Sequence, residues 1–227
     1  APTSGYLKCM ETNELLQLCE QHDFRVQVTK PIGDFLAKHS EYLRTSHQLP
    51  ESLQAKVHQC FLFYTEEKLE DHYLFGFKQI SEIAVKALSP ALNDPATAMK
   101  AIDFIASLLI SKVTRFEKCM FTSKRGVDCI YLQPVPLAAL LSSCITPLRT
   151  YAVNDARVMQ HLFMQLTRVE ALCVCSKDRT AICEQLQAIR DAFAYAGHVE
   201  FDKFEMNVAI QNFNQQKERQ DNLREIA

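Results

Sequence analysis

Apolar residues recur at helical spacing through most of the chain after Pro50, and this periodicity restricts the fold more than any other feature. In the segment 51–73, for example, Leu53, Val57 and Tyr64 follow the spacing of one helix face. The same period returns in the segments 75–88, 95–116, 136–152, 156–175, 178–196 and 200–224. The sequence therefore predicts a mainly helical domain whose helices are joined by short turns.

Residues 1–48 have a different pattern, which predicts a small α+β unit. Residues 24–28 alternate apolar and polar side chains, as a half-buried strand does. Thr12 or Asn13 is the candidate N-cap of a helix over residues 11–22. The other expected elements of this unit are a strand at 5–10, a turn at 31–34 and a strand at 35–43.

A predicted β-hairpin interrupts the helices at residues 116–133, where two β-prone runs flank the turn Lys124-Arg125-Gly126. The expected fold class is α+β and predominantly helical. A small N-terminal strand-helix-strand unit would pack on a multi-helix domain that carries this one hairpin. We assign residues 1–48 to the small unit and residues 49–227 to the helical domain.

Charge and cysteine content restrict the function. With 25 Lys and Arg against 27 Asp and Glu, the net charge is -2, and this balance argues against a nucleic-acid partner. Nine cysteines, an odd number, favour free thiols in a reducing compartment over a disulfide framework. No uncharged apolar run reaches the roughly 18 residues that a membrane helix needs. We therefore expect a soluble, cytoplasmic-type domain.

One short pattern occurs twice. Ala91-Leu92-Asn93-Asp94 and Ala152-Val153-Asn154-Asp155 each precede a predicted helix, and they are 61 residues apart. One interpretation is an old helix–loop–helix duplication. The other is that Asn and Asp are simply the favoured chemistry at a helix N-terminus.

The loop from Ser89 to Pro95 is the most distinctive candidate site. Pro90 disfavours helical geometry at Ser89, Asp94 can cap the next helix, and Pro95 suits its first position. The loop is then either a rigid corner or a helix N-terminus that holds an anion or an ordered water. The candidate ligand-binding residues are Gln79, Ser89, Pro90, Asn93, Asp94, Pro95, Thr97, Asn154 and Asp155.

Signals of catalysis are weak. The five glycines are scattered, so no phosphate-binding Gly-rich loop is present, and no metalloprotease or serine-hydrolase motif occurs. Glu67 and Asp71 would share a helix face beside His72, which makes a weak metal candidate or a solvated charged face. We read Cys144 as a buried helix thiol. We expect no enzyme activity, no catalytic residue and no cofactor.

The string FGFKQISEIAVKALSPALNDPATA, at residues 75–98, resembles the characteristic segment of a family of predicted bacterial membrane proteins, domain of unknown function 2254. Residues 4–36 are similar to the strand–helix–strand segment that follows the family's last membrane helix, and RTYAVNDARVM at 149–159 also fits. The specific core is S-P-x-x-N-D-P. The turn Pro31-Ile32-Gly33-Asp34 departs from the family, where Pro and Gly are expected side by side.

The resemblance implies a membrane region outside these residues, followed by this soluble domain, and it gives no established activity. We expect a non-catalytic regulatory or assembly domain of an integral membrane protein (a channel, transporter or sensor). It would lie at the cytoplasmic face of the inner membrane and form a homo-oligomer. The alternative is a domain that binds a small molecule or anion at the Ser89–Pro95 corner.

Overall fold

The computed structural model describes residues 1–65, 73–115 and 118–226, with side chains described as far as residue 219. The chain folds into two compact units: unit 1 is Ala1–Gly76 with Glu117–Val135, and unit 2 is Phe77–Phe116 with Pro136–Ala227. Residues 49–76 and the hairpin thus belong with the N-terminal strands, whereas the sequence pattern groups them with the helices. The chain passes from unit 1 into unit 2 after Gly76, and it returns to unit 1 for the segment that contains the hairpin. It then enters unit 2 again at Pro136.

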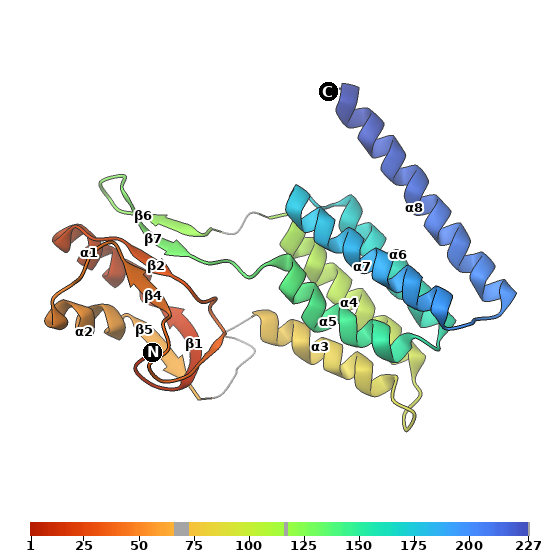
Figure 1. Cartoon of the computed structure of the whole chain (residues 1–227), viewed down its shortest axis with the longest axis horizontal. Helices are drawn as coiled ribbons and strands as arrows, with labels where there is room; N and C mark the ends of the chain where they lie inside the picture. The colour runs from red at the N-terminus through yellow and green to blue at the C-terminus, as the bar shows by residue number, and fades with distance from the viewer. Residues whose placement is uncertain (66–72, 116–117, 227) are drawn as a thin grey trace. The chain divides into compact units, whose positions relative to one another are not determined.

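Unit 1 contains two small sheets in its described residues (Figure 1). Its strands are β1 (Gly5–Met10), β2 (Val26–Val28), β3 (Phe35–Leu36), β4 (Leu43–Thr45), β5 (Phe61–Tyr64), β6 (Met120–Thr122) and β7 (Asp128–Leu132). The first sheet has the order β3-β1-β5 and is antiparallel. The second has the order β4-β2-β7-β6, in which β2 and β7 are parallel. The hairpin β6–β7 therefore extends a sheet that begins near the N-terminus.

Two secondary-structure predictions for unit 1, one of a helix and one of a strand, are wrong. Residues 61–64 form β5, although the spacing over 51–73 predicts one helix. The run Phe-Leu-Phe-Tyr is β-prone, and it forms the ladder beside β1. The single strand predicted at 35–43 is two strands, β3 and β4, which belong to different sheets. The strand at 5–10 and the β-hairpin are confirmed.

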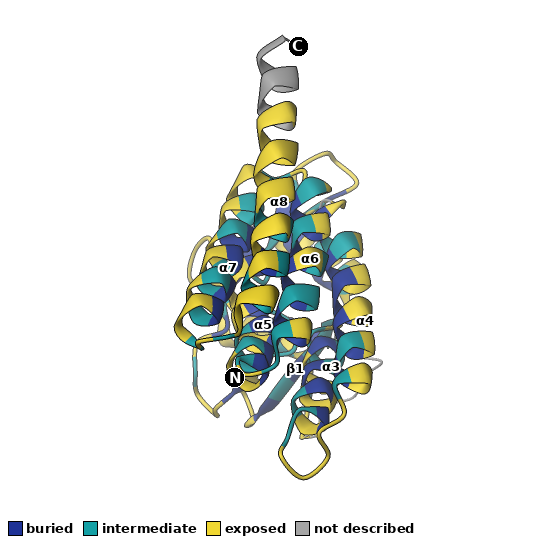
Figure 2. Cartoon of the chain, turned by 90° about the vertical axis from the view of Figure 1, so that its right-hand side faces the viewer, coloured by how far each residue is buried: buried dark blue, intermediate teal, exposed yellow. Residues whose placement is uncertain are grey.

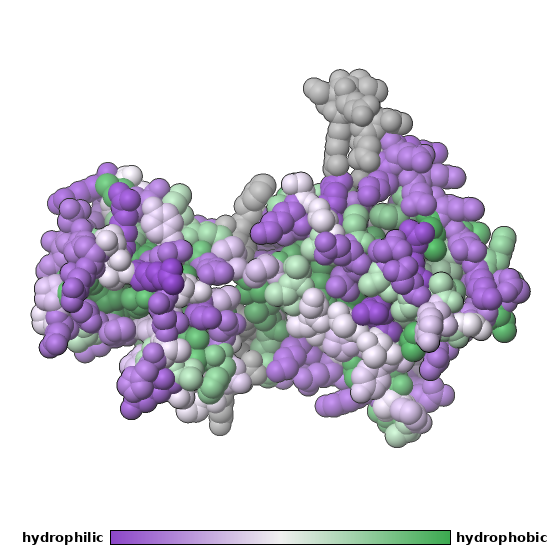
Figure 3. Space-filling model, viewed as in Figure 1, coloured by the Kyte–Doolittle hydropathy of each residue, from purple (hydrophilic) through white to green (hydrophobic). Residues whose placement is uncertain are grey.

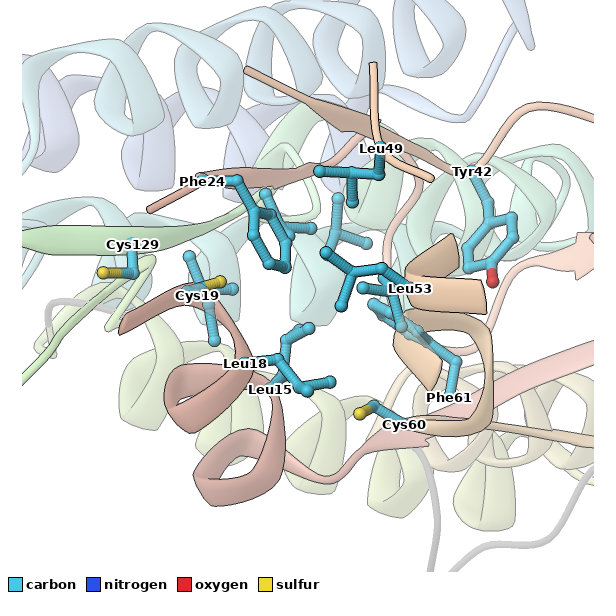
Figure 4. Packing of buried hydrophobic residues seen from close by; sticks show 14 of the residues in the cluster. Leu15, Leu18, Cys19, Phe24, Tyr42, Leu49, Leu53, Cys60, Phe61 and Cys129 are labelled. Atoms are coloured by element: carbon cyan, nitrogen blue, oxygen red, sulfur yellow. The ribbon is translucent and has the colours of Figure 1, made fainter. Parts of the chain in front are cut away.

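The core of unit 1 gathers buried side chains from both sheets and from the helices α1 (Thr12–His22) and α2 (Glu51–Gln59). Figure 4 shows Leu15 and Cys19 of α1 pointing toward the same interior as Leu53 of α2. All three side chains are buried. Burying such side chains from several elements is the main free-energy gain that holds a unit of this size together.

The start of α1 differs from the prediction of Thr12 or Asn13 as its N-cap. The N-cap is Glu11, whose side chain makes no capping hydrogen bond. The Glu11 backbone N–H donates to the carbonyl oxygen of Cys60, 2.8 Å away. Because this bond ties the helix start to the segment before β5, tertiary contact fixes the position of the first turn.

Unit 2 is helical, and its helices confirm the predicted segments to within about one turn. They are α3 (Tyr73–Ala87), α4 (Pro95–Val113), α5 (Leu137–Ala152), α6 (Ala156–Ala171), α7 (Ser176–Tyr195) and α8 (Glu200–Ile226). Helices α4, α6 and α8 form one row, each packed on the next, while α5 and α7 pack in a second row (Figure 1). The expected fold class, α+β and mostly helical, is confirmed.

The hairpins α3–α4 and α5–α6 lie side by side with their helices in parallel. The Ser81 hydroxyl of α3 donates to the carbonyl oxygen of Cys144 in α5, which is 63 residues later. Near the ends of α4 and α6, the Val174 N–H donates to the carbonyl oxygen of Val113. The separations of 63 and 61 residues are close to the 61 residues between the two Asn-Asp patterns. Neighbouring helical hairpins of similar length give such separations with or without a duplication, so both interpretations of the repeated pattern stay open.

Candidate functional site

The Ser89–Pro95 loop is a corner closed by its own backbone. The Asn93 N–H donates to the carbonyl oxygen of Ser89 at 2.9 Å, and the Asp94 N–H donates to that of Ala87 at 2.8 Å. Asn93 has a φ of 46°, in the left-handed region that Asn tolerates better than most residues. These bonds turn the chain from α3 into α4 through seven residues.

Asp94 caps α4 as the sequence predicts. Its Oδ1 accepts from the Thr97 backbone N–H at 3.1 Å, and Pro95 occupies the first turn. Hydrogen bonds from Thr97 and from the Ala96 N–H lower the pKa of the Asp94 carboxyl, because they favour its charged form. The carboxylate is therefore used by the helix itself, which fits the interpretation of a rigid corner.

The second Asn-Asp pattern forms a tighter corner. Asp155 caps α6 by accepting from the Val158 N–H at 3.0 Å. The Asp155 N–H donates to the carbonyl oxygen of Ala152, the last residue of α5. Only three residues separate the two helices, and Asn154 keeps a negative φ.

Of the other predicted residues, Gln79 lies away from the Ser89–Pro95 corner, whereas Pro90, Asn93 and Thr97 lie in it or just after it. Gln79 is exposed on α3, more than two turns before that helix ends at Ala87. Pro90, Asn93 and Thr97 are exposed. Ligand binding by this set stays a prediction.

Glu67, Asp71 and His72 lie outside the described residues. Within the described ranges, no group of three or more His, Cys, Asp or Glu side chains could hold a metal ion. Cys144 is fully buried in α5, and burial raises the pKa of its thiol to about 12, so it stays protonated. That agrees with its interpretation as a buried helix thiol.

Two clusters in unit 2 were not predicted from the sequence. Asp103 of α4 accepts hydrogen bonds from His161, at 2.7 Å, and from Gln165, at 2.6 Å, both on α6. Arg179 of α7 and Lys217 of α8 line one cavity, although they are far apart in the chain. Because each cluster depends on which helices pack together, no local pattern could have identified it.

Comparisons with known proteins place the chain in a wider group. The uncharacterized protein Mb1321c of Mycobacterium bovis and the uncharacterized protein Rv1290c of Mycobacterium tuberculosis are each 24% identical over 200 residues. The matched region covers 83% of this chain but only 38% of each relative, so the chain spans less than half the length of these proteins. No solved structure matches the chain.

A family model described as "Predicted membrane protein" matches residues 1–168, which include both Asn-Asp corners. The chain thus belongs to the class of predicted membrane proteins. It belongs to the family DUF2254, as the sequence resemblance implies. Among the helices described here, none is long and apolar enough to cross a membrane.

Proposed function

We propose that this chain is a non-catalytic regulatory or assembly domain of an integral membrane protein, and that it acts by pairing with a second copy of itself. The membrane-spanning segments would lie outside these 227 residues. The family match supports the membrane context. An exposed apolar stripe on α8 supports the pairing.

The apolar stripe consists of Phe201, Phe204 and Val208, which are 68%, 66% and 39% exposed. Their spacing of three and four residues puts them on one face of α8. The opposite face is already used, because Met206 is buried and Phe213 packs edge-to-face on Phe163 of α6. A helix that is apolar on two faces is suited to lie between two neighbours.

The surroundings of the apolar stripe also favour a protein partner. Tyr195, the last residue of α7, and Val199, just before α8, are also exposed. Figure 2 shows α8 with its outward face exposed along the helix, and Figure 3 shows hydrophobic residues where α7 turns into α8. Several large apolar side chains exposed on neighbouring turns are typical of interaction sites. A second copy is the simplest occupant, since two-fold dimers are the commonest oligomers.

The proposed side of the membrane is the cytoplasmic one. All nine cysteines are free thiols in the structure, and five of them are buried in the two cores. Exported proteins commonly form disulfides, whereas reducing compartments keep thiols free. The free thiols therefore support a cytoplasmic position.

The pairing is tested by analytical ultracentrifugation of the chain and of the full-length protein. We expect a dimer that the double variant Phe201→Ser with Phe204→Ser converts to a monomer. Tyr151→Ser, which removes an exposed aromatic ring elsewhere in unit 2, should leave the dimer intact. Monomers at high concentration for both proteins would contradict the assembly function.

The membrane context has its own test. An antibody to this domain should detect a band well above 25.9 kDa in the membrane fraction of the source cells. A band near 25.9 kDa in the soluble fraction would overturn the membrane assignment without bearing on the dimer.

A further inference from the structure

A cavity in unit 2 lies where the α6–α7 turn and α7 meet α8. Its volume is about 590 Å³, and it is lined by Val174, Ser176, Arg179, Thr180, Cys183 and Lys217. Ligand cavities in proteins usually measure roughly 300–1,000 Å³. The cavity is therefore large enough for a small metabolite.

Two cations from different helices converge on this cavity. The side chain of Arg179 is only 16% exposed, and Lys217 reaches in from α8 until its Nζ is 4.0 Å from the Cys183 Sγ. No carboxylate lies within ion-pair distance of Lys217 in the part of the chain that the structure describes. The ammonium thus faces a thiol where an anion would be the better partner.

Arg179 is held in place before any ligand arrives. Its guanidinium donates to the carbonyl oxygen of Cys173, and its Nη1 lies 3.7 Å from the carboxylate of Glu170, which is buried. Fixing the guanidinium in advance reduces the entropy that binding would otherwise cost. Glu170 offsets the charge of Arg179, so the uncompensated positive charge comes from Lys217 and from the α7 N-terminus.

The first turn of α7 adds donors to the same place. Its N-cap residue, Cys175, makes no side-chain capping bond, unlike Asp94 and Asp155 at α4 and α6. The partial positive charge of a helix N-terminus favours anions. Lys177 and Asp178, also in this turn, have opposite charges and cancel one another formally.

We propose that the cavity between α7 and α8 binds the phosphate group of a small ligand, with Arg179 and Lys217 as the charged contacts and Ser176 at the α7 N-terminus as a polar one. A tetrahedral phosphate has enough acceptor oxygens to meet donors that approach from two helices and a helix end at once. A carboxylate, with two oxygens in one plane, would leave part of this set unused. This site is separate from the Asn-Asp corners and from the proposed dimer surface.

The test is calorimetric titration of inorganic phosphate into the 227-residue chain at constant ionic strength. Lys217→Gln and Arg179→Gln should each weaken phosphate binding about tenfold or more, as expected for loss of one charged hydrogen bond. Arg157→Gln, which removes the same charge from the exposed start of α6, should bind like the unmodified chain. Backbone amides at 176–178 should shift in NMR spectra on adding phosphate.

Lys217→Gln decides the matter if Arg179→Gln fails to fold, because Lys217 is exposed on α8. Absence of phosphate binding by the folded chain would overturn the proposal, as would unchanged binding by Lys217→Gln or tighter binding of malonate than of phosphate. Vesicles distinguish the source of the group. Binding to phosphatidylglycerol but not phosphatidylcholine vesicles, lost in Lys217→Gln, would identify a lipid headgroup; phosphate binding without vesicle binding would identify a free metabolite.

Discussion

The two Asn-Asp corners of unit 2 share a sequence pattern but differ in backbone. Both aspartates cap a helix in the same way, with Oδ1 accepting from the N–H three residues on, at 3.1 Å for Asp94 and 3.0 Å for Asp155. Yet Asn93 is left-handed and Asn154 is not. The capping bond thus depends on the Asp alone, whereas the backbone conformation of the residue before it depends on the rest of the corner.

The difference in backbone arises from the residues that precede each Asn-Asp pair. Helix α3 ends at Ala87, and Pro90 follows within the seven-residue corner, where it blocks helical geometry at Ser89. Helix α5 has Tyr151 at the position equivalent to Pro90, and its own proline, Pro147, lies within the helix. It therefore continues to Ala152, and three residues suffice to turn the chain. Two helical hairpins can therefore share the same capping bond while their corners differ in backbone.

The largest expected effect on stability comes from giving α5 the same buried residue that α3 has at the equivalent position. Ile145 of α5 is buried, and the residue 61 positions earlier, Ala84 of α3, is also buried. Ile145→Ala should lower the free energy of unfolding by about 2–5 kcal/mol, because it leaves a cavity. Urea unfolding measures this. Ile83→Ala, at a half-exposed position of α3, is the control; an equal loss from both would show that α5 is not tightly packed at Ile145.

The backbone difference predicts a smaller, asymmetric effect. Asn93→Ala should cost about 1 kcal/mol, because a Cβ disfavours the left-handed conformation more than the Asn side chain does. Asn154→Ala should be nearly neutral. Asn93→Gly should restore or raise the stability of the first corner. Thermal unfolding of the three variants measures this, and equal losses at Asn93 and Asn154 would show that the corners share one conformation in solution.

The shared caps predict similar effects at both corners. Asp155→Ala should cost about 1 kcal/mol, since it leaves the Val158 N–H without its acceptor. Asp94→Ala should act in the same direction on α4. Asp155→Asn is the matched control, because Asn is also a good N-cap. If Asn and Ala were equally destabilising at 155 in chemical denaturation, the capping bond would not be the cause.

Acid gives the smallest effect and concerns only the first corner. The pKa of Asp94 is lowered below its ordinary value of 3.8 by the Thr97 hydrogen bonds. Its contribution to stability is therefore complete above pH 3.8 and is lost as the pH falls through the lowered folded-state value. The difference in melting temperature between the chain and Asp94→Asn should shrink over that range. A difference that stays constant with pH would contradict the role of the charged form.

Sequence patterns predict the elements of unit 2 better than those of unit 1. Helices α3 to α8 carry long periodic stretches, and Asp94 and Asp155 act on N–H groups only three residues away. The apolar side chains of residues 61–64 suit either period, so the spacing predicts a helix there, and only pairing with β1 makes them a strand. The parallel pairing of Val26 with Ile130 leaves no local signal at all.

The two candidate sites also differ in whether local sequence signals can locate them. The Ser89–Pro95 corner could be located from Pro90, Asp94 and Pro95, because each restricts the backbone within one turn of itself. The cavity of Arg179 and Lys217 could not, because the two residues line it together only where Lys217 of α8 reaches Cys183 of α7. The sequence does not distinguish an arginine on the open surface from one that lines a cavity with a second cation.

By itself, the sequence determined where the helices of unit 2 run, where α4 and α6 are capped, and that β6 and β7 form a hairpin. Those outcomes depend on steric limits and hydrogen bonds between residues a few positions apart. Only the tertiary structure decided that β7 pairs with β2 and that Arg179 and Lys217 line one cavity. It also decided that the helical hairpin α3–α4 lies beside α5–α6. These depend on apolar burial between distant segments, a free energy that no single segment carries.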